Sequence, residues 1–151
     1  MTIHYRDVIR LPSELEGDAI FHASDRSFLE SCDILSLNAP GGEATYHWLN
    51  ADRIAMLPRG AVVVNAARGT LIDDAALIGA LKSGQVGFAG LDVYEGEPKL
   101  NPGYFDLENV VLLPHLGSAT VATRDAMGFL ALDGIGAVLA GRTPGNLVTS
   151  Q

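Results

Sequence analysis

The sequence predicts an α/β fold built on a parallel sheet. Short apolar runs alternate with helical stretches along the chain, which is typical of repeated βαβ units. The run at 61–65 is continuously apolar up to Asn65, without polar alternation, and this pattern suits a parallel strand covered on both faces. With 151 residues, 48% hydrophobic and 19% charged, the chain is long and apolar enough to bury a core.

The composition argues against several classes of protein. The net charge is -8, with 18 acidic against 10 basic residues, so neither a basic nucleic-acid surface nor a polybasic membrane anchor is expected. Cys32 is the single cysteine, which excludes an intramolecular disulfide and a cysteine-based zinc site. We expect Cys32 in the core and the protein in the cytoplasm. We expect no signal peptide, because the first residues lack an apolar stretch, and the apolar stretch at 126–141 is too short to span a bilayer.

Apolar runs and helix-capping residues predict the order of the elements. Apolar runs indicate strands at 3–5, 19–23, 34–38, 61–65, 88–93 and 110–113. Helices are expected at 27–31, at 51–57 after the cap Asn50, at 74–82 between Asp73 and Gly84, and at 121–139 after the cap Thr120. Residues 12–17 form an acidic loop or a helical turn. We expect one domain over 1–144 and a tail over 145–151.

Three polar side chains follow three different predicted strands. Arg68 could bind a carboxylate in bidentate fashion, or it is an ordinary surface arginine. Glu97 lies in the loop after 88–93. His115 is held behind Pro114 at the end of the strand 110–113, as an acid/base group or as a residue that merely caps a loop. Because parallel strands bring such loops to one edge, a cation, a carboxylate and an imidazole could converge there, a combination suited to carbonyl reduction.

A fourth strand end carries an acid. Asp7 follows the strand 3–5, where a dinucleotide fold holds the adenosine ribose, although this segment alone favours an ordinary charged turn. Arg10 lies close enough in sequence to contact an adenine or a phosphate. His4, His22 and His47 show no convincing metal-ligand spacing, and no metal site is expected.

Three motifs in order resemble those of a known family. Asn-Ala-Ala-Arg-Gly at 65–69, Gly-Leu-Asp-Val-Tyr at 90–94 with Glu97-Pro98, and Pro-His-Leu-Gly-Ser at 114–118 are similar to the signatures of D-isomer-specific 2-hydroxyacid dehydrogenases. The similarity runs over 3–148. The stretch 113–120, with Thr123-Arg124 and Met127-Gly128, resembles most the glyoxylate/hydroxypyruvate reductase branch.

The resemblance implies a Rossmann-type doubly wound sheet and a set of roles. His115 would donate a proton to the substrate carbonyl, Glu97 would pair with the other nitrogen of its ring, and Arg68 would hold the substrate carboxylate. It also implies NAD or NADP as cofactor, with NAD preferred because of Asp7, a small 2-oxoacid as substrate, and a homodimer. The implied cofactor-binding residues are Asp7, Arg10, Asn38, Ala39, Pro40, Thr45, Ala66, Asp92, Gly117 and Ser118.

The chain departs from the family at its start. A glycine-rich phosphate loop precedes the ribose acid by roughly 20 residues, but only six residues precede Asp7. Gly134-Ile135-Gly136 lies in a helical pattern and does not replace that loop. We therefore expect a partial Rossmann-type sheet that lacks its first, central strand. A non-catalytic module that binds a dinucleotide or a partner, and an inactive fragment, remain alternatives.

Overall fold

The computed structural model describes residues 1–148, and it divides the chain into two compact units. One unit comprises Met1–Pro114, and the second begins at His115. The expectation of a single domain over 1–144 stays a prediction. Of the expected tail, residues 149–151 lie outside the described residues.

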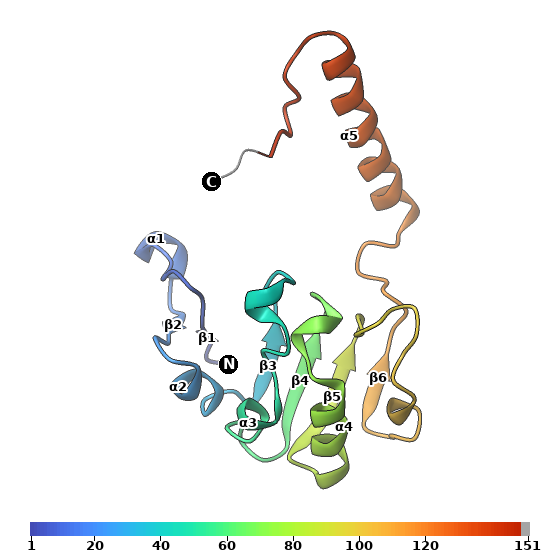
Figure 1. Ribbon diagram of the computed structural model, residues 1–151. Helices are drawn as coiled ribbons and strands as arrows, with labels where there is room; N and C mark the ends of the chain where they lie inside the picture. The colour runs from blue at the N-terminus through green and yellow to red at the C-terminus, as the bar shows by residue number, and fades with distance from the viewer. Residues whose placement is uncertain (149–151) are drawn as a thin grey trace. The chain divides into compact units, whose positions relative to one another are not determined.

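A four-stranded parallel sheet forms the centre of the first unit (Figure 1). Its order is β3-β4-β5-β6, and the strands are β3 (Ile34–Leu37), β4 (Ala61–Asn65), β5 (Val86–Leu91) and β6 (Val110–Leu112). Leu37 pairs with Asn65, Asn65 with Leu91, and Leu91 with Leu112. The four strands therefore end at one level, and the loops that follow them leave from one edge of the sheet. This confirms the α/β fold with parallel strands.

Three helices cover one face of this sheet. They are α2 (Asp25–Leu29), α3 (Ala51–Ile54) and α4 (Asp74–Ser83). Leu77 and Leu81 of α4 share the core with Leu29, Val63 and Cys32. The caps Asn50 and Asp73 are confirmed, since each side chain accepts a backbone N–H in the first turn of its helix. Gly84 ends α4 with a φ of 71°, a conformation that favours glycine.

The other face of the sheet is less covered. Val62 and Val64 are only half-buried, while Ile34 is 58% and Phe88 is 39% exposed. Ile34 pairs with Val62 and Val62 with Phe88, so these side chains form an apolar row across three strands. The expectation that 61–65 is buried on both faces is wrong for this unit, because α2, α3 and α4 all pack on the same face.

The first two strands stand apart from this sheet. β1 (His4–Tyr5) and β2 (Ile20–Phe21) form a separate two-stranded parallel sheet, and within residues 1–148 β1 has no ladder with β3. Residues 12–17 contain a helical turn, α1 (Ser13–Glu16).

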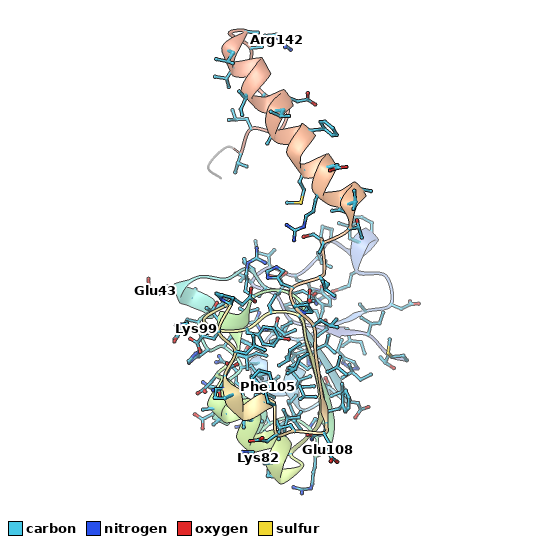
Figure 2. All side chains as sticks on the ribbon, turned by 90° about the vertical axis from the view of Figure 1, so that its right-hand side faces the viewer. Glu43, Lys82, Lys99, Phe105, Glu108 and Arg142 are labelled. Atoms are coloured by element: carbon cyan, nitrogen blue, oxygen red, sulfur yellow. The ribbon has the colours of Figure 1, made fainter. Side chains whose placement is uncertain are left out.

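The remaining elements are short turns and one long helix. The turns are η1 (Glu43–Thr45), η2 (Gly69–Leu71) and η3 (Pro102–Tyr104). In the second unit, α5 (Val121–Leu139) begins after Thr120 as expected. Figure 2 shows its side chains standing out around the helix, and Phe129, Leu132 and Ile135 are each more than half exposed. None of the helices within residues 1–148 combines the length and apolarity needed to cross a membrane.

Because β1 and β3 lie at the edges of two separate sheets, we expect consequences for the behaviour of the chain in solution. An unpaired buried backbone group costs about 1–3 kcal/mol, and bare strand edges invite pairing with another chain. We expect the 151-residue chain to exchange amide hydrogens rapidly over residues 1–21, or to associate with a second copy. Light scattering after size-exclusion chromatography, with hydrogen exchange, measures both. A monomer strongly protected at both 3–5 and 34–38 would contradict this expectation.

Candidate active site at the carboxyl edge of the sheet

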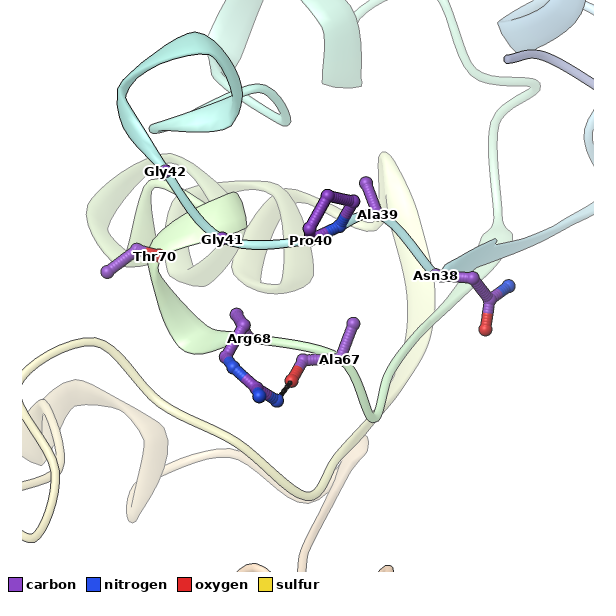
Figure 3. A pocket seen from close by; sticks show the side chains of 8 residues that line it. All are labelled: Asn38, Ala39, Pro40, Gly41, Gly42, Ala67, Arg68 and Thr70. Carbon is purple, nitrogen blue, oxygen red and sulfur yellow. Dashed lines mark hydrogen bonds between the residues drawn. The ribbon is translucent and has the colours of Figure 1, made fainter. Parts of the chain in front are cut away.

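The loops after β3 and β4 enclose an open hollow of about 650 Å³ at the carboxyl edge (Figure 3). It is lined by Asn38, Ala39, Pro40, Gly41, Gly42, Ala67, Arg68 and Thr70. Three of the expected cofactor-binding residues, Asn38, Ala39 and Pro40, thus lie beside the expected substrate-binding residue Arg68. This is the place in an open parallel sheet where ligands bind.

Small residues keep the hollow open. A Cβ on Gly41 would lie 3.1 Å from the Cγ of Arg68, so a larger residue there would press on the arginine. The hydroxyl of Thr45 donates to the carbonyl of Pro40 at 2.7 Å. Thr45 therefore holds the loop and is not among the lining residues. Ala66 is exposed directly after β4 and precedes the lining residue Ala67.

The side chain of Asn65 shapes the loop that carries Arg68. Asn65 is fully buried, and its amide nitrogen donates to the carbonyl of Arg68 at 2.9 Å. Its amide oxygen accepts the N–H of Ala67 at 3.1 Å. The guanidinium of Arg68 is exposed, with one nitrogen donating to the carbonyl of Ala67 at 2.6 Å. With five N–H donors in a planar fork, such a group can bind a carboxylate.

The loop after β5 packs against the Arg68 loop. A Cβ on Gly69 would lie 1.8 Å from the carbonyl carbon of Tyr94, so the two backbones touch where only glycine fits. The N–H of Tyr94 donates to the carboxylate of Glu97 at 2.8 Å. The buried carboxylate residue Asp92 continues the β4–β5 ladder through its N–H, which donates to the carbonyl of Asn65 at 2.9 Å.

The hydroxyl of Tyr94 joins the ends of two strands. It lies 2.9 Å from the carbonyl of Leu91 and 2.7 Å from that of Leu113, and its single proton is shared between them. Burial raises the pKa of Tyr94, so the phenol remains a donor at neutral pH. Leu113 precedes Pro114 and His115, and Tyr94 thereby fixes the backbone from which the His115 segment departs.

His115 begins the second unit and has a φ of 55°. This left-handed conformation is uncommon for residues other than glycine, and it often occurs at functional sites. Arg68 and Glu97 belong to the first unit, and the expected meeting of His115 with them stays a prediction. The same holds for the cofactor contacts expected of Gly117 and Ser118.

Carboxylates hold both arginines near the expected ribose site. Asp7 is exposed, and one oxygen of its carboxylate accepts the N–H of Val8 at 2.6 Å. Arg10 makes two hydrogen bonds to Glu16, at 2.9 and 2.7 Å. These bonds and one from Tyr5 lower the pKa of Glu16 to about 2, so it stays charged at neutral pH. Arg6 pairs with Asp25 at 3.1 Å.

The structure also brings together residues that the sequence analysis left without a role. The carboxylate of Glu95 lies 2.9 Å from a ring nitrogen of His47 and accepts the hydroxyl of Tyr46 at 2.8 Å. Hydrogen bonds from His47 and then Tyr46 lower the pKa of Glu95. In the sequence, the only indication of this contact is that Glu95 lies in the same predicted loop as Glu97, two residues before it. Within residues 1–148, no cluster of three or more His, Cys, Asp or Glu residues could hold a metal ion.

A parallel sheet with a hollow at its carboxyl edge is typical of nucleotide-binding α/β domains. Residues 1–117 match the family described as D-isomer specific 2-hydroxyacid dehydrogenase, NAD binding domain. The chain belongs to this family, and the match confirms the resemblance inferred from the three motifs.

Individual relatives agree with this family. The chain is 43% identical over 143 residues to glycerate dehydrogenase from Hyphomicrobium methylovorum, covering 93% of this chain and 44% of that enzyme. A Polaromonas crystal structure assigned to the same family superposes with a TM-score of 0.93 at 47% identity, covering 98% and 46%. The crystal structure of the NADPH-dependent glyoxylate/hydroxypyruvate reductase from Sinorhizobium meliloti, in complex with NADP and malonate, superposes with a TM-score of 0.84 at 38% sequence identity. The match covers 91% of this chain and 42% of that reductase. The chain spans less than half the length of each relative.

The contact between Gly69 and Tyr94 predicts a large effect of one methyl group. Gly69→Ala would force two backbones apart, and overpacking of this kind typically costs about 1–3 kcal/mol. Gly79→Ala is the control, because a Cβ at Gly79 in α4 meets nothing within 4 Å. That substitution should stabilise by about 0.5–1 kcal/mol through helix propensity. Urea denaturation of the 151-residue chain measures both, and equal effects would contradict the contact.

Proposed function

We propose that the whole protein containing this chain reduces a small 2-oxoacid to a 2-hydroxyacid with NADH or NADPH. Glyoxylate and hydroxypyruvate are the proposed substrates, because the relatives include a glycerate dehydrogenase and a glyoxylate/hydroxypyruvate reductase. The observation that supports it most is the hollow at the carboxyl edge, where an exposed guanidinium borders a loop of small residues.

The residues present fit a nicotinamide dinucleotide in part. Ala39, Gly41 and Ala67 let a flat ring approach the backbone closely, and Asp7 offers a carboxylate to ribose hydroxyls. A phosphate-binding glycine loop of the usual kind precedes the ribose acid by roughly 20 residues. We propose that the part of the whole protein preceding this chain supplies that loop and the central strand.

The reaction divides among three side chains. Arg68 binds the substrate carboxylate and fixes the carbonyl next to it, which lowers the entropic part of the barrier. When bound, the reduced nicotinamide supplies the hydride that the carbonyl carbon accepts. His115 donates its proton to the carbonyl oxygen, giving the 2-hydroxyacid and a neutral imidazole. Glu97 stabilises the imidazolium before the transfer, since a nearby negative charge favours the protonated ring.

The charges near β1 favour NAD over NADP. Both arginines that could bind a 2′-phosphate are held by carboxylates, Arg10 by Glu16 and Arg6 by Asp25. Asp25 also pairs with Arg53 at 2.7 Å. Asp7 therefore dominates the charge that a ribose would meet, and it would repel a 2′-phosphate. The proposal further includes a homodimer. It also places the protein in the cytoplasm, where cysteines such as the buried Cys32 stay reduced.

Catalysis is tested in a chimera that joins this chain to the part of Hyphomicrobium glycerate dehydrogenase that the chain lacks. His115→Ala should lower kcat by about 10²–10⁴-fold, because proton transfer by a positioned side chain is typically worth that much. Arg68→Ala should raise KM for the oxoacid and lower kcat. Glu97→Gln should move the fall in reductive activity to lower pH. If His115→Ala kept a kcat near that of the unmodified chimera, His115 would not be the general acid.

Cofactor choice is tested in the same chimera. We expect a higher kcat/KM with NADH than with NADPH. Glu16→Gln should shift that ratio toward NADPH by releasing Arg10, whereas Glu30→Gln, at the exposed pair with Arg26, should leave it unchanged. A preference for NADPH in the unmodified chimera would show that the arginines outweigh Asp7.

A further inference from the structure

We propose that Asn65 is a positioning residue that sets where the Arg68 guanidinium can bind the substrate carboxylate. The inference rests on the proposed function of Arg68 and adds a residue to it. Asn65 has no exposed surface, yet both polar atoms of its side chain bond to the loop that carries the arginine. Buried amide groups in proteins are nearly always hydrogen-bonded. Here the two partners, the N–H of Ala67 and the carbonyl of Arg68, lie on either side of the Arg68 Cα.

The two hydrogen bonds fix the backbone around Arg68. The N–H of Ala67, just before Arg68, donates to the amide oxygen of Asn65 at 3.1 Å. The carbonyl of Arg68 itself accepts from the amide nitrogen at 2.9 Å. The loop lies beyond the end of β4 and makes no strand ladder there, so a side chain replaces the ladder bonds. The direction of the Cα–Cβ bond of Arg68 follows from these two contacts.

Close contacts confine the same loop from other sides. Gly69 touches the backbone of Tyr94, and Gly41 lies against the aliphatic stem of Arg68. These contacts limit how far the loop can move, but they are non-directional. The hydrogen bonds of Asn65 choose one orientation within that space. Binding a carboxylate with a planar fork depends on orientation, and a displacement of about 1 Å can cost 10²-fold in rate.

The chemistry of the position requires an amide. One atom must accept from an N–H and the other must donate to a carbonyl, and asparagine provides both at this length. Aspartate keeps the acceptor but sets a negative oxygen against the carbonyl of Arg68. Serine can still accept from Ala67, as hydroxyls do in similar turns, but it cannot reach the carbonyl of Arg68.

Asn65→Ser is compared with a matched control at the opposite edge of the sheet. Asn109 donates to the carbonyls of Leu81 and Gly87, both at 3.2 Å, so Asn109→Ser also removes amide bonds to backbone carbonyls. In the chimera, Asn65→Ser should lower kcat/KM for the oxoacid by about 10- to 100-fold. The KM for NADH should change less than twofold. Asn109→Ser should lower thermal stability and leave both kinetic constants near wild type.

A double variant separates positioning from general damage. In the Arg68→Ala background, Asn65→Ser should cost less than about twofold further, because two residues that act as one unit are not additive. An equal loss for oxoacid and NADH, a full additional loss in the Arg68→Ala background, or kinetics like those of Asn109→Ser would overturn the proposal. If Arg68→Ala itself leaves the oxoacid kcat/KM unchanged, the proposed function of Arg68 fails instead.

A second measurement uses the 151-residue chain alone. Oxalate is titrated while the Nε–H resonance of Arg68 is followed by NMR in the unmodified chain, in Asn65→Ser and in Asn65→Asp. Both variants should weaken the oxalate response by about tenfold or more, and Asn109→Ser should not. Unchanged responses in variants that retain the dispersed spectrum of the folded chain would refute a positioning role.

Discussion

The parallel ladder around β4 is the constraint on which the rest of this structure depends. β4 pairs on both sides, with β3 and with β5, and its residues Ala61, Val63 and Asn65 are buried. Because the strands are parallel and in register at Leu37, Asn65 and Leu91, their loops leave from one edge. The hollow, the Arg68 loop and the Glu97 loop all follow from that alignment.

At this edge the loops contact one another through their backbones. The loops after β4 and β5 meet at Gly69 and Tyr94, where the absence of a side chain permits contact between main chains. Asn65 and Glu97 then satisfy backbone groups that have left the ladder. Buried polar groups of this kind are costly when unpaired, so the same bonds that stabilise the loops also restrict their geometry. The backbone of the loop that carries Arg68 is therefore held on both sides of the Arg68 Cα.

Charge is arranged differently around β1. The acidic excess of the sequence appears here as carboxylates paired with Arg6 and Arg10, and Asp7 is left exposed to solvent. Because these pairs are partly exposed, each stabilises the fold only modestly. Their larger consequence is for recognition, since an arginine that is already paired binds a phosphate less readily. The sheet that carries them is only two strands wide, and such a ribbon is marginally stable by itself.

The sequence by itself determined the fold class, the order of the strands along the chain, the caps Asn50, Asp73 and Thr120, and the family. These follow from local patterns, and a parallel ladder turns strand ends that are distant in sequence into neighbours. The roles expected of Arg68, Asn38 and Pro40 stay predictions, although all three line the hollow at the carboxyl edge. Tertiary structure alone decided that one face of the sheet is half exposed, that Arg10 is bound to Glu16, and that His47 meets Glu95. Such contacts join positions as far apart as 48 residues, and they depend on how side chains fill space after the chain has folded.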